Sequence, residues 1–205
     1  MDGKQGSLAV EGSSAIIPVI LQLLDRKWPV VVASRDWHPA GHISFASSHS
    51  GSEPFTKKDG QDLWPDHCVQ GSSGAEIEKR VGDRLRKLKH DGTLVHYVEK
   101  GSNPKVDAYS AFASDESPDP DPETDESPLA DYLHVHGVVE VYCAGLATDY
   151  CVAATAKASQ RWGFETYVLT DAIRAVGGDG GTEKTLDELR KQGIKTMLTT
   201  ELPDH

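Results

Sequence analysis

The sequence predicts an α/β protein in which a parallel sheet is covered by helices on both faces. Short apolar runs rich in β-branched residues alternate with longer stretches of helical pattern, as is typical of that class. A chain of 205 residues is long enough for one domain with a sizeable core. Three chemically active side chains, Asp36, Lys100 and Cys151, follow the ends of predicted strands, where sites of parallel sheets lie.

Each apolar run has the length and the flanking turn residues expected of a buried strand. In chain order the predicted strands are Val30–Ser34, Thr93–Val98, Val138–Ala144, Thr166–Thr170 and Ile194–Leu198. The predicted helices between them are Ser13–Lys27, Leu129–His136, Thr148–Trp162 and Thr182–Gln192.

An acidic, proline-rich segment at residues 114–128 interrupts this alternation. It has too few apolar side chains to bury a core of its own. We therefore expect a surface loop inside a single domain that spans residues 1–205.

Composition restricts the partners and the compartment. The 21 basic and 32 acidic residues give a net charge of −11, which argues against binding to nucleic acid. Three cysteines without framework spacing favour a reducing environment. The sequence shows no apolar run of membrane-spanning length and no signal-peptide pattern, so we expect a cytoplasmic protein, with nuclear and peroxisomal locations left open.

The most informative motif is Gly145-Leu-Ala-Thr-Asp-Tyr-Cys-Val-Ala-Ala154, which links a predicted strand to a predicted helix. It places Cys151 in the first turn of the helix, where unpaired amides and the helix dipole stabilise a thiolate. The same amides can hold an oxyanion. A buried cysteine with a purely structural role is the alternative.

A second motif suggests a metal site. Asp36 and His38 point the same way on an extended segment, His42 follows, and His67 lies in Trp-Pro-Asp-His-Cys. One carboxylate with two or three imidazoles suits Zn²⁺ with positions open to water or substrate. The alternative is a polar loop that contains histidines by chance, and we interpret Cys68 as structural.

Taken together, these motifs resemble the nicotinamidase branch of the isochorismatase-like cysteine hydrolases. That family implies a three-layer α/β/α parallel sheet. The matching stretches are Gly6–Ile20, Ser34–Ser47, Trp64–Glu76, Lys100–Phe112 and Gly145–Ala156.

The resemblance assigns a role to each candidate residue. Cys151 is the nucleophile, Lys100 the catalytic lysine, and the amides of Ala147 and Cys151 the oxyanion hole, with a cis peptide expected before Ala147. The implied metal ligands are Asp36, His38 and His67, with His42 as a further possible ligand. The implied substrate-binding residues are Trp64, Tyr109, Leu146, Ala147 and Tyr150.

The implied reaction is hydrolysis of nicotinamide to nicotinate and ammonia through a cysteine thioester, a step of NAD salvage. The implied partners are this small substrate and a divalent ion, most simply Zn²⁺, with a homo-oligomer left open. A related small-carboxamide amidase and a catalytically dead binding protein are the alternatives.

One element of the family pattern is missing upstream of Gly6. The family has a central first strand that ends in the catalytic aspartate, whereas here five residues precede Gly6 and Asp2 has no strand to fix it. We therefore expect an N-terminally truncated chain without the catalytic Asp and with unpaired neighbouring strands. Such a chain is expected to be poorly stable or inactive.

Overall fold

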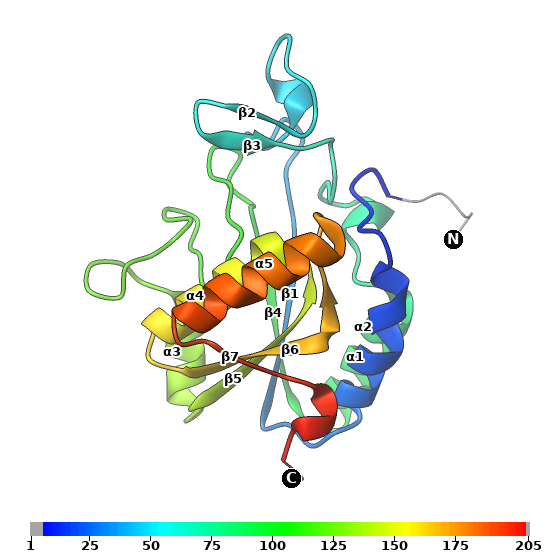
Figure 1. The fold of residues 1–205 in the computed structure, drawn as a ribbon, viewed down its shortest axis with the longest axis vertical. Coiled ribbons are helices and arrows are strands. Elements are labelled where there is room, and N and C mark those ends of the chain that lie inside the picture. Colours follow the sequence, from blue (N-terminus) through cyan, green and yellow to red (C-terminus); the bar gives the residue numbers. More distant parts are fainter. Residues whose placement is uncertain (1–5, 204–205) are drawn as a thin grey trace.

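The computed structural model describes residues 6–203, so Asp2 lies outside the described residues. Figure 1 shows an α/β arrangement in which helices pack on both sides of parallel strands. The strands are β1 (Val30–Asp36), β2 (Thr56–Lys58), β3 (Gln61–Leu63), β4 (Leu94–Lys100), β5 (Glu140–Leu146), β6 (Glu165–Arg174) and β7 (Lys195–Met197). The α-helices are α1 (Ile17–Leu24), α2 (Lys79–His90), α3 (Pro128–Val135), α4 (Ala153–Arg161) and α5 (Gly178–Lys191).

Strands β1 and β4 form a parallel pair, and their register places Asp36 beside Lys100. Val30 lies opposite Leu94, and the pairing continues to Asp36 opposite Lys100 at the carboxyl ends. Two residues that are 64 positions apart in sequence thus become neighbours across a strand pair. The predicted coincidence of functional residues at strand ends follows directly from this register.

Strands β5, β6 and β7 form a second parallel sheet in that order. Within residues 6–203, β1 and β5 each pair along one edge, and no ladder joins them to each other. The parallel strands and helices of the predicted class are confirmed, but one continuous sheet is not formed. Within the described residues, β1 pairs only with β4, and β5 pairs only with β6.

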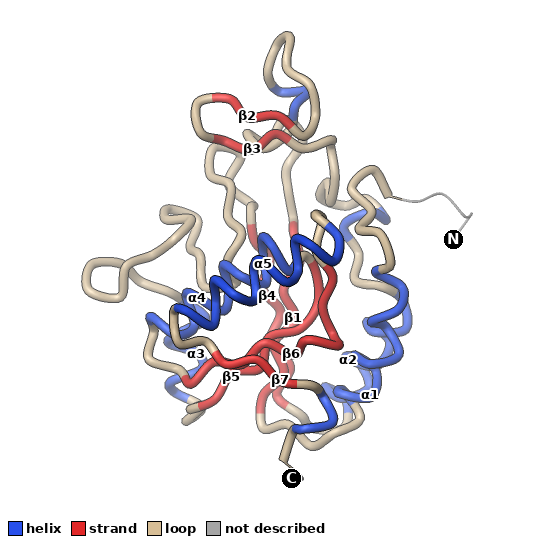
Figure 2. Tube along the Cα trace, in the orientation of Figure 1, coloured by secondary structure: helices blue, strands red, loops and turns tan. Residues whose placement is uncertain are grey.

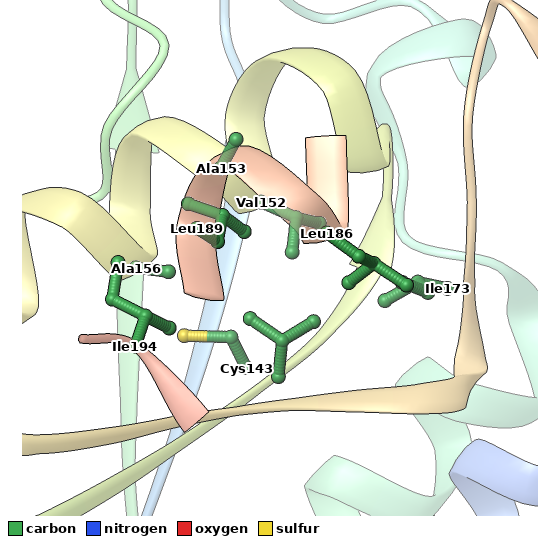
Figure 3. Close-up of a cluster of buried hydrophobic side chains, with 9 residues drawn as sticks. Cys143, Val152, Ala153, Ala156, Ile173, Leu186, Leu189 and Ile194 are labelled. Carbon is green, nitrogen blue, oxygen red and sulfur yellow. The ribbon is translucent and has the colours of Figure 1, made fainter. Parts of the chain in front are cut away.

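Helices cover both faces of the strands, so the layers are those of the predicted class. Helices α4 and α5 bury one face of the second sheet in a dry cluster (Figure 3) that contains Cys143, Ile173 and Leu189. Leu23 of α1 packs against Leu169 on the other face of β6. Helices α1 and α2 together cover β1 and β4, and α3 closes the opposite side.

Two elements were not predicted. Helix α2 has strongly charged residues between its apolar positions, and only the spacing of Val81, Leu85 and Leu88 marks its buried face. The β2–β3 hairpin is short and stands away from the two parallel sheets in Figure 2.

The boundaries of two predicted elements also change. The acidic loop ends at Ser127 because Pro128 already begins α3, and the Ser127 hydroxyl accepts from Ala130 N at 3.3 Å to cap that helix. The first predicted helix opens with a 3₁₀ turn at Ser13–Ile16 and ends at Leu24. None of the described helices combines the length and apolarity needed to cross a membrane.

Candidate active site

A cavity of about 340 Å³ lies where β1, β4 and β5 end. The amino-terminal segment from Gly6 to Val10 forms part of its wall. The residues predicted from sequence that line it are Asp36, His38, Trp64, His67, Tyr109, Leu146, Ala147, Tyr150 and Cys151. The fold therefore brings together side chains that come from distant stretches of the chain.

Lys100 connects the carboxylate and the thiol of this site. Its side chain is 7% exposed, and its Nζ donates to Sγ of Cys151 at 3.1 Å and to the carbonyl of Ala108 at 3.5 Å. The same ammonium forms an ion pair with Asp36. Lys100 thus lies between the two groups and touches both.

The electrostatics follow from this geometry. Burial alone lowers the pKa of Lys100, but Asp36 and Cys151 outweigh burial and raise it, so the side chain stays an ammonium. Burial alone raises the pKa of Asp36, but the Lys100 ammonium holds it below its usual value. Burial raises the pKa of Cys151 more than Lys100 lowers it, so the resting group is a thiol. Lys100 therefore favours ionisation of the Cys151 thiol, but its effect on the pKa is smaller than that of burial.

The turn that carries Cys151 is fixed at both ends. Strand β5 ends at Leu146, the expected cis peptide joins Leu146 to Ala147, and a π-helical turn at Thr148–Val152 leads into α4. Asp149 within this turn accepts from Val176 N at 3.0 Å and from Gly177 N at 2.9 Å. Those amides lie just before α5, so a carboxylate at the positive end of one helix holds the turn that carries Cys151.

His38 and His67 are oriented as ligands of a metal ion. Each Nδ1 donates to a backbone carbonyl, that of Gly101 at 3.0 Å and that of Pro65 at 2.8 Å, so Nε2 is the nitrogen that can face a metal ion. One ligand atom each of Asp36, His38 and His67 lie within 4.8 Å of one another. Burial lowers the pKa of His38 to about 4, which keeps its imidazole neutral and able to bind a cation. The donor set fits a divalent ion such as Zn²⁺.

His42 is placed differently, although its side chain is buried beside His38. Its Nε2 donates to the carbonyl of Val106 at 3.1 Å, and its Nδ1 accepts from the Ser44 amide at 3.2 Å and hydroxyl at 2.8 Å. Both ring nitrogens of His42 therefore form hydrogen bonds within the protein. The arrangement favours a structural role that supports the loop.

Cys68 lines the cavity but is not in the group formed by Asp36, His38 and His67. Burial raises the pKa of its thiol to about 12, so it is a poor nucleophile at neutral pH.

Three aromatic side chains form one wall of the cavity. Trp64 Nε1 donates to the Tyr109 hydroxyl at 3.3 Å. The Trp64 and Tyr150 rings meet edge to face with centroids 4.8 Å apart, and Tyr109 lies 5.6 Å from Tyr150. This wall suits a flat aromatic ligand.

Sequence reasoning missed Asp107, Gln61 and Val176. Asp107 and Val176 line the cavity, and Gln61 Nε2 donates to Asp107 at 2.6 Å. Asp107 was detectable, because it is the carboxylate within the Lys100–Phe112 stretch and lies two residues before Tyr109. Gln61 and Val176 carried no such signal, since their roles depend on loop packing.

Chemically, the cavity combines a thiol activated by an ammonium, two imidazole nitrogens with a carboxylate, and an aromatic wall. These are the parts needed for nucleophilic attack on a polarised carbonyl next to a flat ring.

Comparison with known proteins agrees with this chemistry. Residues 4–201 match the Isochorismatase domain family. A nicotinamidase of Acinetobacter baylyi is 37% identical over 94% of this chain and 85% of its own length. The yeast nicotinamidase bound to the inhibitor nicotinaldehyde has a TM-score of 0.80 and 31% identity, covering 97% of this chain and 94% of that one. A Pyrococcus horikoshii pyrazinamidase in complex with zinc has a TM-score of 0.70 and 32% identity, covering 97% and 92%.

Proposed function

This chain belongs to the isochorismatase family and is an amidohydrolase, and we propose that its substrate is nicotinamide. The observation that carries the proposal is the contact of Lys100 Nζ with Cys151 Sγ at 3.1 Å, inside a cavity that also holds His38 and His67. The nicotinamidase relatives and the aromatic wall support nicotinamide over other small amides.

In the proposed reaction the Cys151 sulfur attacks the carboxamide carbon. A C–S bond forms, and the carbonyl oxygen becomes an oxyanion; we assign its stabilisation to the amides of Ala147 and Cys151. The C–N bond then breaks, the nitrogen takes up the proton that the Cys151 thiol gave up, and ammonia leaves. Water cleaves the remaining thioester to release nicotinate and regenerate the thiol.

Lys100 compensates the negative charge that forms on the Cys151 sulfur during the reaction. Its ammonium stabilises the thiolate before attack and each time the sulfur leaves. Asp36 holds that ammonium in place from its other side. Within residues 6–203, Asp36 is the carboxylate that forms a salt bridge with Lys100.

We further propose that Asp36, His38 and His67 hold a divalent ion, with Zn²⁺ supported by the zinc-bound pyrazinamidase neighbour. Such an ion supplies a Lewis acid that can bind the ring nitrogen of the substrate. Trp64, Tyr109 and Tyr150 then enclose the ring and keep its carboxamide near Cys151. Such an enzyme serves NAD salvage.

An ammonia-release assay with nicotinamide tests the proposal. The purified chain is expected to release ammonia and form a nicotinoyl adduct visible by mass spectrometry, whereas Cys151→Ala is expected to do neither. Equal ammonia release by both proteins would eliminate Cys151 as the nucleophile.

The same assay separates the enzyme from a binding protein. Calorimetric binding of nicotinamide without ammonia release would favour a binding protein. Release of ammonia from another small carboxamide, but not from nicotinamide, would favour the related amidase.

A further inference from the structure

We infer that Asp107 is a charge-selecting residue of this cavity, whose carboxylate favours neutral ligands over anionic ligands at Cys151. This inference deepens the proposed function: its consequence for turnover rests on that function, because the proposed substrate is a neutral amide and the proposed product a carboxylate.

The position of Asp107 is the first step of the argument. Its side chain lines the cavity, and one carboxylate oxygen accepts from Gln61 Nε2 at 2.6 Å. A carboxylate oxygen of Asp107 also lies within 4.8 Å of ring nitrogens of His38 and His42. The carboxylate is therefore held at a fixed place in the wall by a neutral amide.

The charge of Asp107 is not neutralised by a basic side chain. Among residues 6–203, no lysine or arginine forms a salt bridge with it. The ammonium of Lys100 is already paired with Asp36. Asp107 therefore contributes a negative charge that no lysine or arginine among residues 6–203 pairs with.

The field of this carboxylate reaches the reacting atom. Its negative charge is one of the causes that raise the pKa of Cys151, and it acts in the same direction on Tyr109. An anion placed at Cys151 experiences the same repulsion, whereas a neutral carboxamide does not. In the proposed reaction this repulsion acts on nicotinate once it has formed and promotes its release.

The test compares two alkylating reagents of similar shape and different charge, iodoacetamide and iodoacetate. Each reacts by the same displacement, in which Cys151 Sγ forms a C–S bond and iodide leaves with the electrons of the C–I bond. The rate of each reagent at Cys151 is measured by peptide mass spectrometry, which separates Cys151 from Cys68 and Cys143. The ratio of the two rates cancels any change in the fraction of thiolate.

We expect Asp107→Asn to increase the iodoacetate rate relative to the iodoacetamide rate by about fivefold or more. Asp107→Glu keeps the charge and should retain the wild-type ratio. Gln61→Leu removes the hydrogen bond without changing the charge, so it should also retain that ratio. All proteins are compared as the full chain at matched metal content.

An unchanged ratio in Asp107→Asn, or an equal change in Gln61→Leu, would overturn the inference. Neither result depends on nicotinamide turnover, so a chain that releases no ammonia refutes the proposed function and leaves this test intact. If the chain is active, Asp107→Asn should also strengthen inhibition by nicotinate with a smaller change in the KM for nicotinamide. A loss of both affinities in equal measure would indicate a merely structural residue.

Discussion

Gly101 allows His38 to take its position, and Gly101→Ala is the most direct test of the candidate metal site. A Cβ at residue 101 would lie 2.4 Å from Cε1 and 2.5 Å from Nδ1 of His38, where ordinary contacts begin at 3.4 Å. The imidazole must therefore retreat by about 1 Å, whereas a metal site tolerates about 0.2 Å. The hydrogen bond from His38 Nδ1 to the Gly101 carbonyl would be disturbed by the same movement.

The size of the effect can be estimated from two contributions. Gly101 has φ of 66°, and an alanine in this left-handed conformation costs about 1–2 kcal/mol. The clash adds about 1–3 kcal/mol. We therefore expect the free energy of unfolding to fall by about 2–5 kcal/mol, and the zinc affinity by about 10- to 100-fold.

Urea unfolding and competition with a chromogenic zinc chelator measure these two quantities. Gly137→Ala is the matched control, because Gly137 has φ of 67° and a Cβ there would meet nothing within 4 Å. It should show the conformational cost alone and an unchanged zinc affinity. If Gly101→Ala matched Gly137→Ala in both measurements, the reasoning about His38 would be refuted.

Three further changes test the electrostatics and the core. Lys100→Gln should slow iodoacetamide alkylation of Cys151 at pH 7 by about tenfold, because the ammonium lowers the pKa of that thiol; an unchanged rate would contradict the role of Lys100. Burial raises the pKa of Cys143 to about 12 from its ordinary 9.0, so its stabilising effect is complete below pH 9 and lost at about 1.4 kcal/mol per pH unit as the pH rises toward 12. The stability advantage of wild type over Cys143→Ala, measured by urea unfolding, should shrink over that range, and a constant difference would refute this assignment. Phe112→Ala should cost about 3–5 kcal/mol because Phe112 is 1% exposed, while Val135→Ala, at 83% exposure, should stay within about 0.5 kcal/mol; similar urea midpoints for the two variants would contradict the core assignment.

Prediction from sequence worked best where the signal is local. The five predicted strands are all present as β1, β4, β5, β6 and β7, because a run of β-branched apolar residues prefers extended backbone wherever it is buried. The junction at Cys151 was also readable, since a strand, a turn and a helix follow one another without a gap. Helix α2 was not predicted, because most of its side chains are charged and its apolar pattern is weak.

Prediction was weaker where a residue's role depends on its hydrogen-bond partners. Asp-x-His and the later histidine identified Asp36, His38 and His67 as a group, and the structure brings their ligand atoms together. His42 matched the same pattern, yet Ser44 and Val106 use both of its nitrogens. A sequence pattern gives the type of a side chain but not the atoms that it faces.

The sequence by itself determined the class of fold and the family to which the chain belongs, because these follow from residue type and local order, and it singled out Cys151 and Lys100 as candidates. The tertiary structure alone decided that Asp36 and Lys100 are paired across β1 and β4, and that Lys100 reaches Cys151. It also decided that the parallel strands form two sheets, and that Asp107 lies in the cavity wall. These facts depend on strand register and loop packing, which arise from contacts between segments far apart in the chain.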